Sequence, residues 1–175
     1  MELLRGKHLF LRPLETTDLE LLYQWENHTS NWQAGSNLTP FSRFYLEQYI
    51  ISAQNNIYED KQLRLIIENY HSQVVGIIDM FNFDPHHRRA AVGILIGSEY
   101  RRKGYASEAL SVLKEYAKEI LNMHQLYCTI EHGNNHSLDL FLKQGFIVTG
   151  TRLNWNLRGN KWTHEDFLQC IFQDS

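Results

Sequence analysis

Long hydrophobic runs are missing from this sequence of 175 residues. No stretch is apolar for the length that a bilayer requires, and residues 1–14 lack the uninterrupted hydrophobic region of a signal peptide. A strong charge imbalance is missing too, because 17 basic residues face 20 acidic ones. This balance argues against a nucleic-acid binder held by a broad basic surface. We therefore expect a cytoplasmic protein that binds neither membranes nor nucleic acids.

Cysteine is scarce. The chain has two, Cys128 and Cys170, and each lies in a strand-like run. We interpret both as buried, reduced thiols, with a disulfide or a nucleophile as the minority alternative. His132 and His136 have helix-like spacing, but no thiolate or glutamate supports them as zinc ligands. The sequence therefore predicts no metal site.

No repeat, low-complexity segment or linker divides the chain, so we expect one domain, 1–175, with a full core. Apolar runs bounded by turn residues predict strands at 8–14, 63–68, 74–83, 89–96, 126–130, 146–157 and 167–172. Periodicity and capping signals predict helices at 17–25, from Ser42, after Gly104 and at 137–143. Thr17 and Glu20 have the spacing of a capping box. The order is that of a mixed α/β domain with an antiparallel meander in its first half.

One stretch, residues 90–121, organises the rest of the chain. An apolar strand that ends near Gly97 gives way to a basic turn, and Gly104 then precedes a long amphipathic helix. The first amides of a helix have no intrahelical acceptor, and the helix dipole adds partial positive charge there. The turn has neither the Gly-Lys-Ser/Thr of a Walker P-loop nor a GxGxxG motif. We expect it to bind a phosphate-bearing ligand.

Combined with later residues, this turn indicates a family. Arg101-x-x-Gly104-x-Ala106, between a strand and an amphipathic helix, resembles the acyl-CoA pyrophosphate motif of the GNAT N-acetyltransferases. The residues that resemble the second CoA motif follow in the same order: Asn134, Ser137, Gly145 and Phe146. The opening, residues 9–25, is similar to the branch with spermidine acetyltransferases and ribosomal-protein N-terminal acetyltransferases. The resemblance covers nearly the whole chain.

The resemblance implies a GNAT fold, whose mostly antiparallel sheet is splayed at the CoA site and flanked by helices, with acetyl-CoA as co-substrate. The backbone of residues 94–96 would pair with the pantetheine arm, and amides of residues 102–107 would cradle the pyrophosphate. Asn134 would hydrogen-bond the same ligand; its alternative role is a helix cap, which Asn135 would provide equally well. The implied donor site comprises Ile94, Leu95, Ile96, Arg101, Arg102, Lys103, Gly104, Tyr105, Ala106, Ser107, Asn134, Ser137 and Phe141.

The implied reaction is direct attack of a primary amine on the thioester. Near pH 7 about one part in a thousand of an alkyl ammonium of pKa ~10 is neutral, so we expect a base or a water chain. The predicted catalytic residues are Glu131 and Asp79, a carboxylate within an apolar strand. The alternative for Asp79 is a place on the solvated face of its strand. Asp84 and His87 are further candidates for the base.

Phe141 departs from the family pattern. It stands where many GNAT enzymes carry a tyrosine thought to protonate the leaving thiolate. Phenylalanine has no proton to give, so water or another side chain would serve. CoA thiolate leaves readily in any case, because its thiol-like pKa is roughly 8.5.

The resemblance places the acceptor opposite CoA, between the first two helices and the final hairpin. Trp32, Asp84 and His87 are the predicted substrate-binding residues. Their alternatives are a tryptophan that packs its loop, a turn-capping aspartate and a solvated histidine. Trp155 and Trp162 would complete an aromatic wall with Trp32, or else pack separately.

Three functions stay open at this point. The first is an acetyl-CoA-dependent N-acetyltransferase acting on a small amine, a polyamine or an amino sugar. The second is a protein N-terminal acetyltransferase of the ribosomal type, and the third is a catalytically weak acyl-CoA-binding module. No Asp or Glu occurs within residues 27–42, which puts a polyamine allosteric site in doubt. The resemblance also implies a homo-oligomer, a dimer or a larger ring.

Overall fold

A computed structural model of the chain describes residues 4–28, 39–53 and 56–173. Its centre is one sheet of seven strands in the order β1-β2-β3-β4-β5-β7-β6. The strands are β1 (Leu9–Pro13), β2 (Leu63–Asn69), β3 (Val74–Asp84), β4 (Arg89–Ile96), β5 (Gln125–Glu131), β6 (Ile147–Arg158) and β7 (Lys161–Ile171). The predicted mixed α/β class is confirmed, as is the antiparallel meander through β2, β3 and β4.

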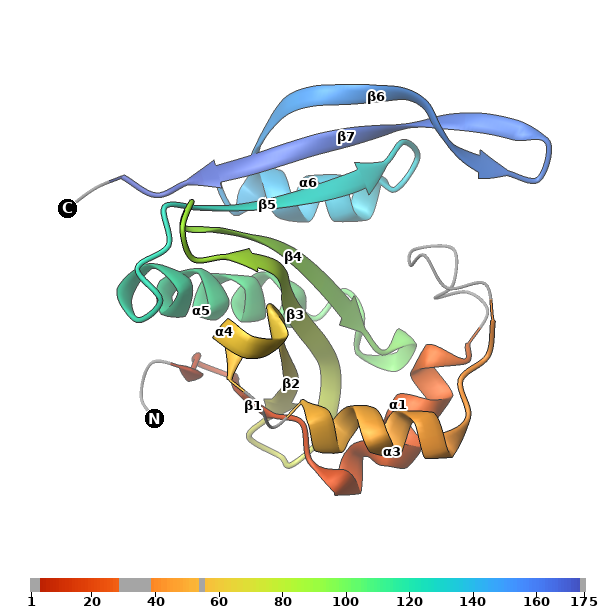
Figure 1. Cartoon of the computed structure of the whole chain (residues 1–175), viewed down its shortest axis with the longest axis vertical. Helices are drawn as coiled ribbons and strands as arrows, with labels where there is room; N and C mark the ends of the chain where they lie inside the picture. The colour runs from red at the N-terminus through yellow and green to blue at the C-terminus, as the bar shows by residue number, and fades with distance from the viewer. Residues whose placement is uncertain (1–3, 29–38, 54–55, 174–175) are drawn as a thin grey trace.

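Helices cover both faces of the sheet (Figure 1). They are η2 (Thr16–Asp18), α1 (Leu19–Glu26), α3 (Arg43–Ser52), α4 (Ile57–Asp60), η3 (Ser98–Tyr100), α5 (Tyr105–Glu119) and α6 (Asn135–Lys143). The larger cluster of buried residues joins one face to α5 and α6, for example through Leu110 and Phe141. A smaller cluster joins the other face to α1 and α3 through Leu22 and Ile50. Among the described residues, no helix is long and apolar enough to cross a membrane.

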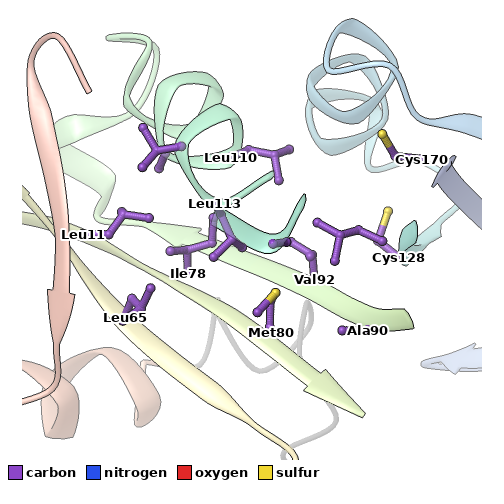
Figure 2. Packing of buried hydrophobic residues seen from close by; sticks show 14 of the residues in the cluster. Leu11, Leu65, Ile78, Met80, Ala90, Val92, Leu110, Leu113, Cys128 and Cys170 are labelled. Carbon is purple, nitrogen blue, oxygen red and sulfur yellow. The ribbon is translucent and has the colours of Figure 1, made fainter. Parts of the chain in front are cut away.

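The apolar face of α5 forms the centre of the larger cluster. Leu110 and Leu113 lie over Ile78 and Val92 of the sheet (Figure 2). The predicted period of this helix is therefore confirmed. Burying one leucine side chain contributes roughly 2 kcal/mol, so α5 is fixed firmly on β3 and β4.

Both cysteines lie in this same core, as Figure 2 shows. Cys128 and Cys170 are free thiols and both are buried, which confirms the prediction. Burial raises the pKa of the Cys128 thiol to about 12. A thiol with such a pKa carries almost no thiolate near neutral pH, so Cys128 is a packing residue.

The 3-10 turn η2 begins at Thr16, ahead of α1 at Leu19, and it has a different capping box from the predicted one. The box is formed by Glu15 and Asp18, and the Glu15 amide donates to Asp18 Oδ2 over 2.8 Å. Arg12 holds the same carboxylate through two hydrogen bonds of 2.8 and 2.9 Å. Arg12 holds the Asp18 carboxylate, and Asp18 rather than Glu20 accepts the hydrogen bond from the Glu15 amide. The prediction for Thr17 and Glu20 was therefore wrong.

The final strand also begins earlier than predicted, at Lys161. Residues 161–164 extend beyond the last pair of β7 with β5, Glu131 with Glu165, where Figure 1 shows the hairpin projecting past β5. Side chains there have no core to face, so the sequence shows no apolar alternation. The single turn α4 was missed because four residues are too few to reveal a helical period.

Candidate active site

The sheet is split between β4 and β5. These two strands are parallel, and they pair only where residues 89–91 meet residues 125–127. Beyond Ala91 they diverge, which Figure 1 shows as a widening gap between the two ribbons. Residues 92–96 still pair with β3 on their other side, Ile94 with Ile78. The second half of β4 therefore presents a free backbone edge inside the molecule.

An unpaired edge within a sheet is unusual, since backbone groups away from water need hydrogen-bond partners. Ile94, Leu95 and Ile96, which the resemblance assigns to the pantetheine arm, lie on this part of β4. An extended ligand arm with amide groups, such as pantetheine, has the chemistry to pair with it as an added strand. The edge leads directly to the turn before α5.

The turn before α5 forms a second set of free backbone groups. Arg102 and Gly104 both have positive φ, 62° and 85°. No amide from residue 102 to residue 107 has an acceptor within the described part of the chain, and the first helical bond runs from Glu108 N to Gly104 O. A Cβ on Gly104 would meet no atom within 4 Å. The amides therefore face open space, a geometry that suits a pyrophosphate.

The basic side chains of the turn differ in their contacts. Arg101 donates from Nε to the Ile96 carbonyl over 3.1 Å, so it closes the turn. Lys103 lies over the ring of Tyr100 at 5.5 Å. Arg102 has no ion-pair partner among the described residues. The turn therefore adds positive charge beside the amides, and Arg101 also shapes the backbone.

Asn134 begins α6 at the end of β5. Its Oδ1 accepts from the Ser137 amide over 3.3 Å, so Asn134, not Asn135, caps the helix. The cap uses only the oxygen, and the Nδ2 group has no partner among the described residues. Asn134 is therefore the helix cap, and its contact with CoA stays a prediction. It lines a small cavity of about 230 Å³ together with His132 and Asp166.

His132 and Asp166 form a hydrogen-bonded pair in that cavity. His132 Nε2 lies 2.9 Å from Asp166 Oδ1, and the Thr151 hydroxyl donates to the same oxygen over 2.6 Å. The Thr151 hydrogen bond, followed by the bond to His132, holds the pKa of Asp166 below its usual range. The sequence did not indicate this pair, because Asp166 comes from a strand segment that was itself not predicted.

Phe141 is buried in the core. Its ring meets Phe146 edge to face, with centroids 4.9 Å apart and planes at 88°. The side chain that replaces the family tyrosine is thus held by α6 and the start of β6. It supplies apolar packing and no proton.

Both carboxylate oxygens of Asp79 accept hydrogen bonds from an arginine. Arg64 Nε and Nη2 donate to its two oxygens over 2.7 and 3.0 Å, and Arg64 Nη1 donates to Glu26 over 2.7 Å. Tyr49 packs under the guanidinium at 5.2 Å, and burial raises the pKa of Tyr49 to about 12. Burial lowers the pKa of Arg64, but the charges of Asp79 and Glu26 raise it further. Arg64 therefore stays charged, and Asp79 is a base only if this pair opens.

Glu131 is engaged in the same manner at the opposite side of the split. Arg158 donates to both of its oxygens, with the shortest contact at 2.6 Å, and the Thr163 hydroxyl also donates to it. Burial raises the pKa of Glu131, but the bonds from Arg158 and Thr163 outweigh it and hold the pKa below its usual range. Glu131 is thus a weak base in this arrangement.

The predicted acceptor residues lie in separate places. Asp84 accepts from the His87 amide over 2.9 Å, and this bond, the largest cause, lowers the pKa of Asp84. Trp155 and Trp162 lie exposed on the β6–β7 hairpin, and Arg152 covers Trp155 at 4.9 Å. Trp32 lies outside the described residues. Within those residues, no group of three or more His, Cys, Asp or Glu is placed to hold a metal ion.

Sequence reasoning did not find Arg64 and Glu26, which form an ion-pair cluster with Asp79. Their signal was present, because Arg64 interrupts an apolar strand as Asp79 does in the next one. Antiparallel pairing places these two residues directly opposite each other. An arginine and an aspartate in facing positions of a predicted meander therefore indicate an ion pair.

Comparison with known proteins connects this geometry to a family. The sequence family described as the acetyltransferase (GNAT) domain matches residues 8–147. The spermidine N(1)-acetyltransferase of Escherichia coli K12 is 26% identical over 163 residues, which are 93% of this chain and 85% of that protein. The putative ribosomal N-acetyltransferase YdaF of Bacillus subtilis is also 26% identical, over 83% of this chain and 81% of its own length.

Solved structures show the same fold. The spermidine N-acetyltransferase of Vibrio cholerae in complex with CoA and spermine superimposes with a TM-score of 0.84 at 22% identity, covering 95% of this chain and 96% of that one. The splayed sheet, the free amides before α5 and the family match agree with one another. The chain belongs to the GNAT acetyltransferase family and is an N-acetyltransferase that uses acetyl-CoA.

Proposed function

We propose that this enzyme acetylates a primary amine of a small polyamine. The observation that carries the proposal is the free edge of β4 leading into the phosphate cradle, because it orients the donor. The polyamine class is supported by the spermidine N(1)-acetyltransferases among the relatives. It is supported further by the carboxylates on the α1 side of the sheet.

The donor is oriented by backbone groups. With its pyrophosphate on the amides of residues 102–107 and its pantetheine arm on residues 94–96, the acyl end points toward Ala91, where β4 and β5 meet. A free amide on the β4 edge would then polarise the thioester carbonyl. Holding amine and thioester in line would lower the barrier further, since alignment can contribute up to roughly 7–11 kcal/mol.

The carboxylates on the α1 side would attract the cationic acceptor. Among the described residues, Glu26 and Asp79 both pair with Arg64, so these three side chains together carry one net negative charge. The side chains are only 18–22% exposed, so their field is screened less than that of a surface pair. Asp79 and Glu131 stay predictions as bases, because each would act only after its arginine moves. A water molecule is the simplest proton acceptor otherwise.

A thiol-release assay with a panel of acceptors tests the proposal. We expect spermidine and spermine to be acetylated with a kcat/KM at least about tenfold above those for amino acids and aminoglycosides. Faster reaction of peptides with a free α-amine would overturn it in favour of the N-terminal acetyltransferase function. The similarity to YdaF is the observation that favours this second candidate. No turnover above the uncatalysed rate on any acceptor would leave an acyl-CoA-binding module.

We also propose that the chain forms a homo-oligomer through the edge strand β6. This strand exposes Leu153, Trp155 and Leu157, and its outer backbone edge has no neighbour among the described strands. An exposed apolar edge strand favours pairing with another chain. Light scattering after size exclusion tests this point, and a monomer at micromolar concentration would refute it. The cytoplasmic location and the single-domain organisation of residues 1–175 stay predictions.

A further inference from the structure

A short basic loop stands beside the donor site without a role in the proposed reaction. It comprises Arg5, Gly6, Lys7 and His8, just before β1. The Gly6 amide donates to the Leu9 carbonyl over 2.8 Å. The Tyr70 hydroxyl donates to the Gly6 carbonyl over 2.9 Å. The basic loop is thus a built turn with several fixed contacts.

Glu108 ties the basic loop to the first turns of α5. It accepts from the His8 amide over 2.6 Å at Oε1, and its Oε2 lies 2.9 Å from His8 Nδ1. A Cβ on Gly6 would lie 2.3 Å from Glu108 Oε1, so glycine permits this close approach. The basic loop is therefore held against the same helix whose first amides form the phosphate cradle.

A cavity of about 600 Å³ lies between the basic loop and the cradle. Besides the basic loop and Glu108, its lining consists of Gly104, Ser107, Ser111, Val112, Glu115 and Gln144. Gly104 and Ser107 belong to the cradle as well. The cavity therefore begins where the pyrophosphate would lie, and a ligand held there has room to continue toward the basic loop.

The cavity lining carries two cations, Arg5 and Lys7, and two carboxylates, Glu108 and Glu115. Lys7 has no ion-pair partner among the described residues, and the contact of Arg5 is with the ring of Phe10 at 5.4 Å. Glu108 is occupied by the loop itself. Glu115 is the opposing carboxylate on the lining. Arginine and lysine side chains of this kind bind phosphate through charge-assisted hydrogen bonds.

We propose that Arg5 and Lys7 bind the 3′-phosphate of CoA and thereby select CoA over dephospho-CoA. This inference rests on the proposed donor orientation, in which the cradle holds the pyrophosphate. Beyond its pyrophosphate, CoA carries an adenosine with a phosphate monoester on the ribose. The adjoining cavity receives this end of the molecule, and the basic loop supplies the charges that match the monoester.

Calorimetric binding of CoA and dephospho-CoA tests the proposal without any acceptor. The wild type should bind CoA about tenfold more tightly, the equivalent of one charge-assisted contact. Lys7→Gln should weaken CoA binding by about threefold to tenfold and leave dephospho-CoA binding unchanged. Arg5→Gln should act in the same direction. Lys118→Gln, which removes one charge at the other end of α5, is the matched control and should retain the full preference.

The proposal is overturned if the wild type binds both ligands equally, or if Lys7→Gln and Arg5→Gln weaken both ligands alike. Unchanged CoA binding in both variants overturns it as well. Thermal unfolding of each variant shows whether the fold is intact. The acceptor is tested separately: if the preference is found but spermidine is not acetylated, the polyamine proposal fails and this one stands.

Discussion

The proposed donor site and the carboxylates proposed to act on the acceptor differ in their hydrogen bonding. The first has free backbone groups, and the second are paired with arginines. On the proposed donor side, β4 has no strand partner from β5 beyond Ala91, and the amides of residues 102–107 have no acceptor in the described part of the chain. The two carboxylates predicted as bases, Asp79 and Glu131, lie on opposite sides of the split, and each receives two or more hydrogen bonds from an arginine. The proposed donor site therefore has free backbone groups, whereas the carboxylates predicted as bases already have partners.

This difference predicts that the backbone of the fold binds the donor, whereas side chains bind the acceptor. Backbone amides neither titrate nor change rotamer, so the donor site needs little reorganisation to bind. An amine that enters the acceptor side competes with Arg64 or Arg158 for the carboxylates. Donor affinity should therefore be insensitive to the ion pairs, and acceptor affinity should depend on them. The substitutions below separate the two sides.

Substituting Gly104 should have the largest effect. Gly104→Glu places a side chain at φ 85° and a negative charge where the phosphates would lie. We expect acetyl-CoA affinity to fall by at least about 1,000-fold, roughly 4 kcal/mol. Isothermal calorimetry measures it. Gly159→Glu is the control, because Gly159 also has positive φ but lies in the hairpin turn. Unchanged affinity in a folded Gly104→Glu variant would refute the cradle.

Breaking the ion pair between Asp79 and Arg64 should lower the stability of the protein and leave donor binding unchanged. Asp79→Asn leaves Arg64 with one carboxylate partner, and we expect a loss of about 2 kcal/mol in the free energy of unfolding, less than for a fully buried pair. Urea denaturation measures the loss. Donor affinity should stay within about twofold of the wild type. The exposed pair of Asp84 and Arg89, at 3.3 Å, offers a matched control in Asp84→Asn. A large loss of CoA binding in Asp79→Asn would contradict the separation of the two sides.

The same contrast explains why the turn before α5 was predicted from the sequence and the ion pairs were not. The donor motif is local, since a strand, a turn and a helix start lie within residues 90–107, and its backbone geometry follows from a few residue types. Ion pairs depend on the register between strands. Glu131 meets Arg158, 27 residues away, across a hairpin with two register shifts. No local pattern fixes such shifts, so the arginine partners were missed, whereas the free amides at the start of α5 were predicted.

Glu131→Gln should have a smaller effect that depends on pH. Arg158 and Thr163 lower the pKa of Glu131 in the folded state, below its ordinary value of 4.5. The stabilisation is therefore present above pH 4.5 and is lost as the pH falls through the lowered pKa. We expect the variant to be less stable by about 0.5–1 kcal/mol at pH 7, since the Arg158 side is partly exposed.

Urea denaturation at pH 7 and at pH 3 measures how the difference in free energy of unfolding between wild type and variant changes with pH. The gap between wild type and Glu131→Gln should narrow at pH 3, because the wild-type carboxyl is then partly protonated. Glu119→Gln, on the exposed end of α5, is the control and should show no gap at either pH. A gap that widens in acid would mean that the Arg158 contact does not stabilise the carboxylate.

Phe141→Tyr should change the molecule least, yet it tests the reaction most directly. The ring lies buried against Phe146, so a hydroxyl must find room at the edge of the core, and we expect up to about 1 kcal/mol of destabilisation. Donor affinity should stay nearly unchanged, because the cradle and the β4 edge are backbone groups on other elements. Turnover should stay equal or rise, since the new hydroxyl offers the departing thiolate a proton that phenylalanine lacks. A collapse of turnover in a folded variant would show that the aromatic packing of Phe141 itself positions the donor, and the two sides would then not be independent.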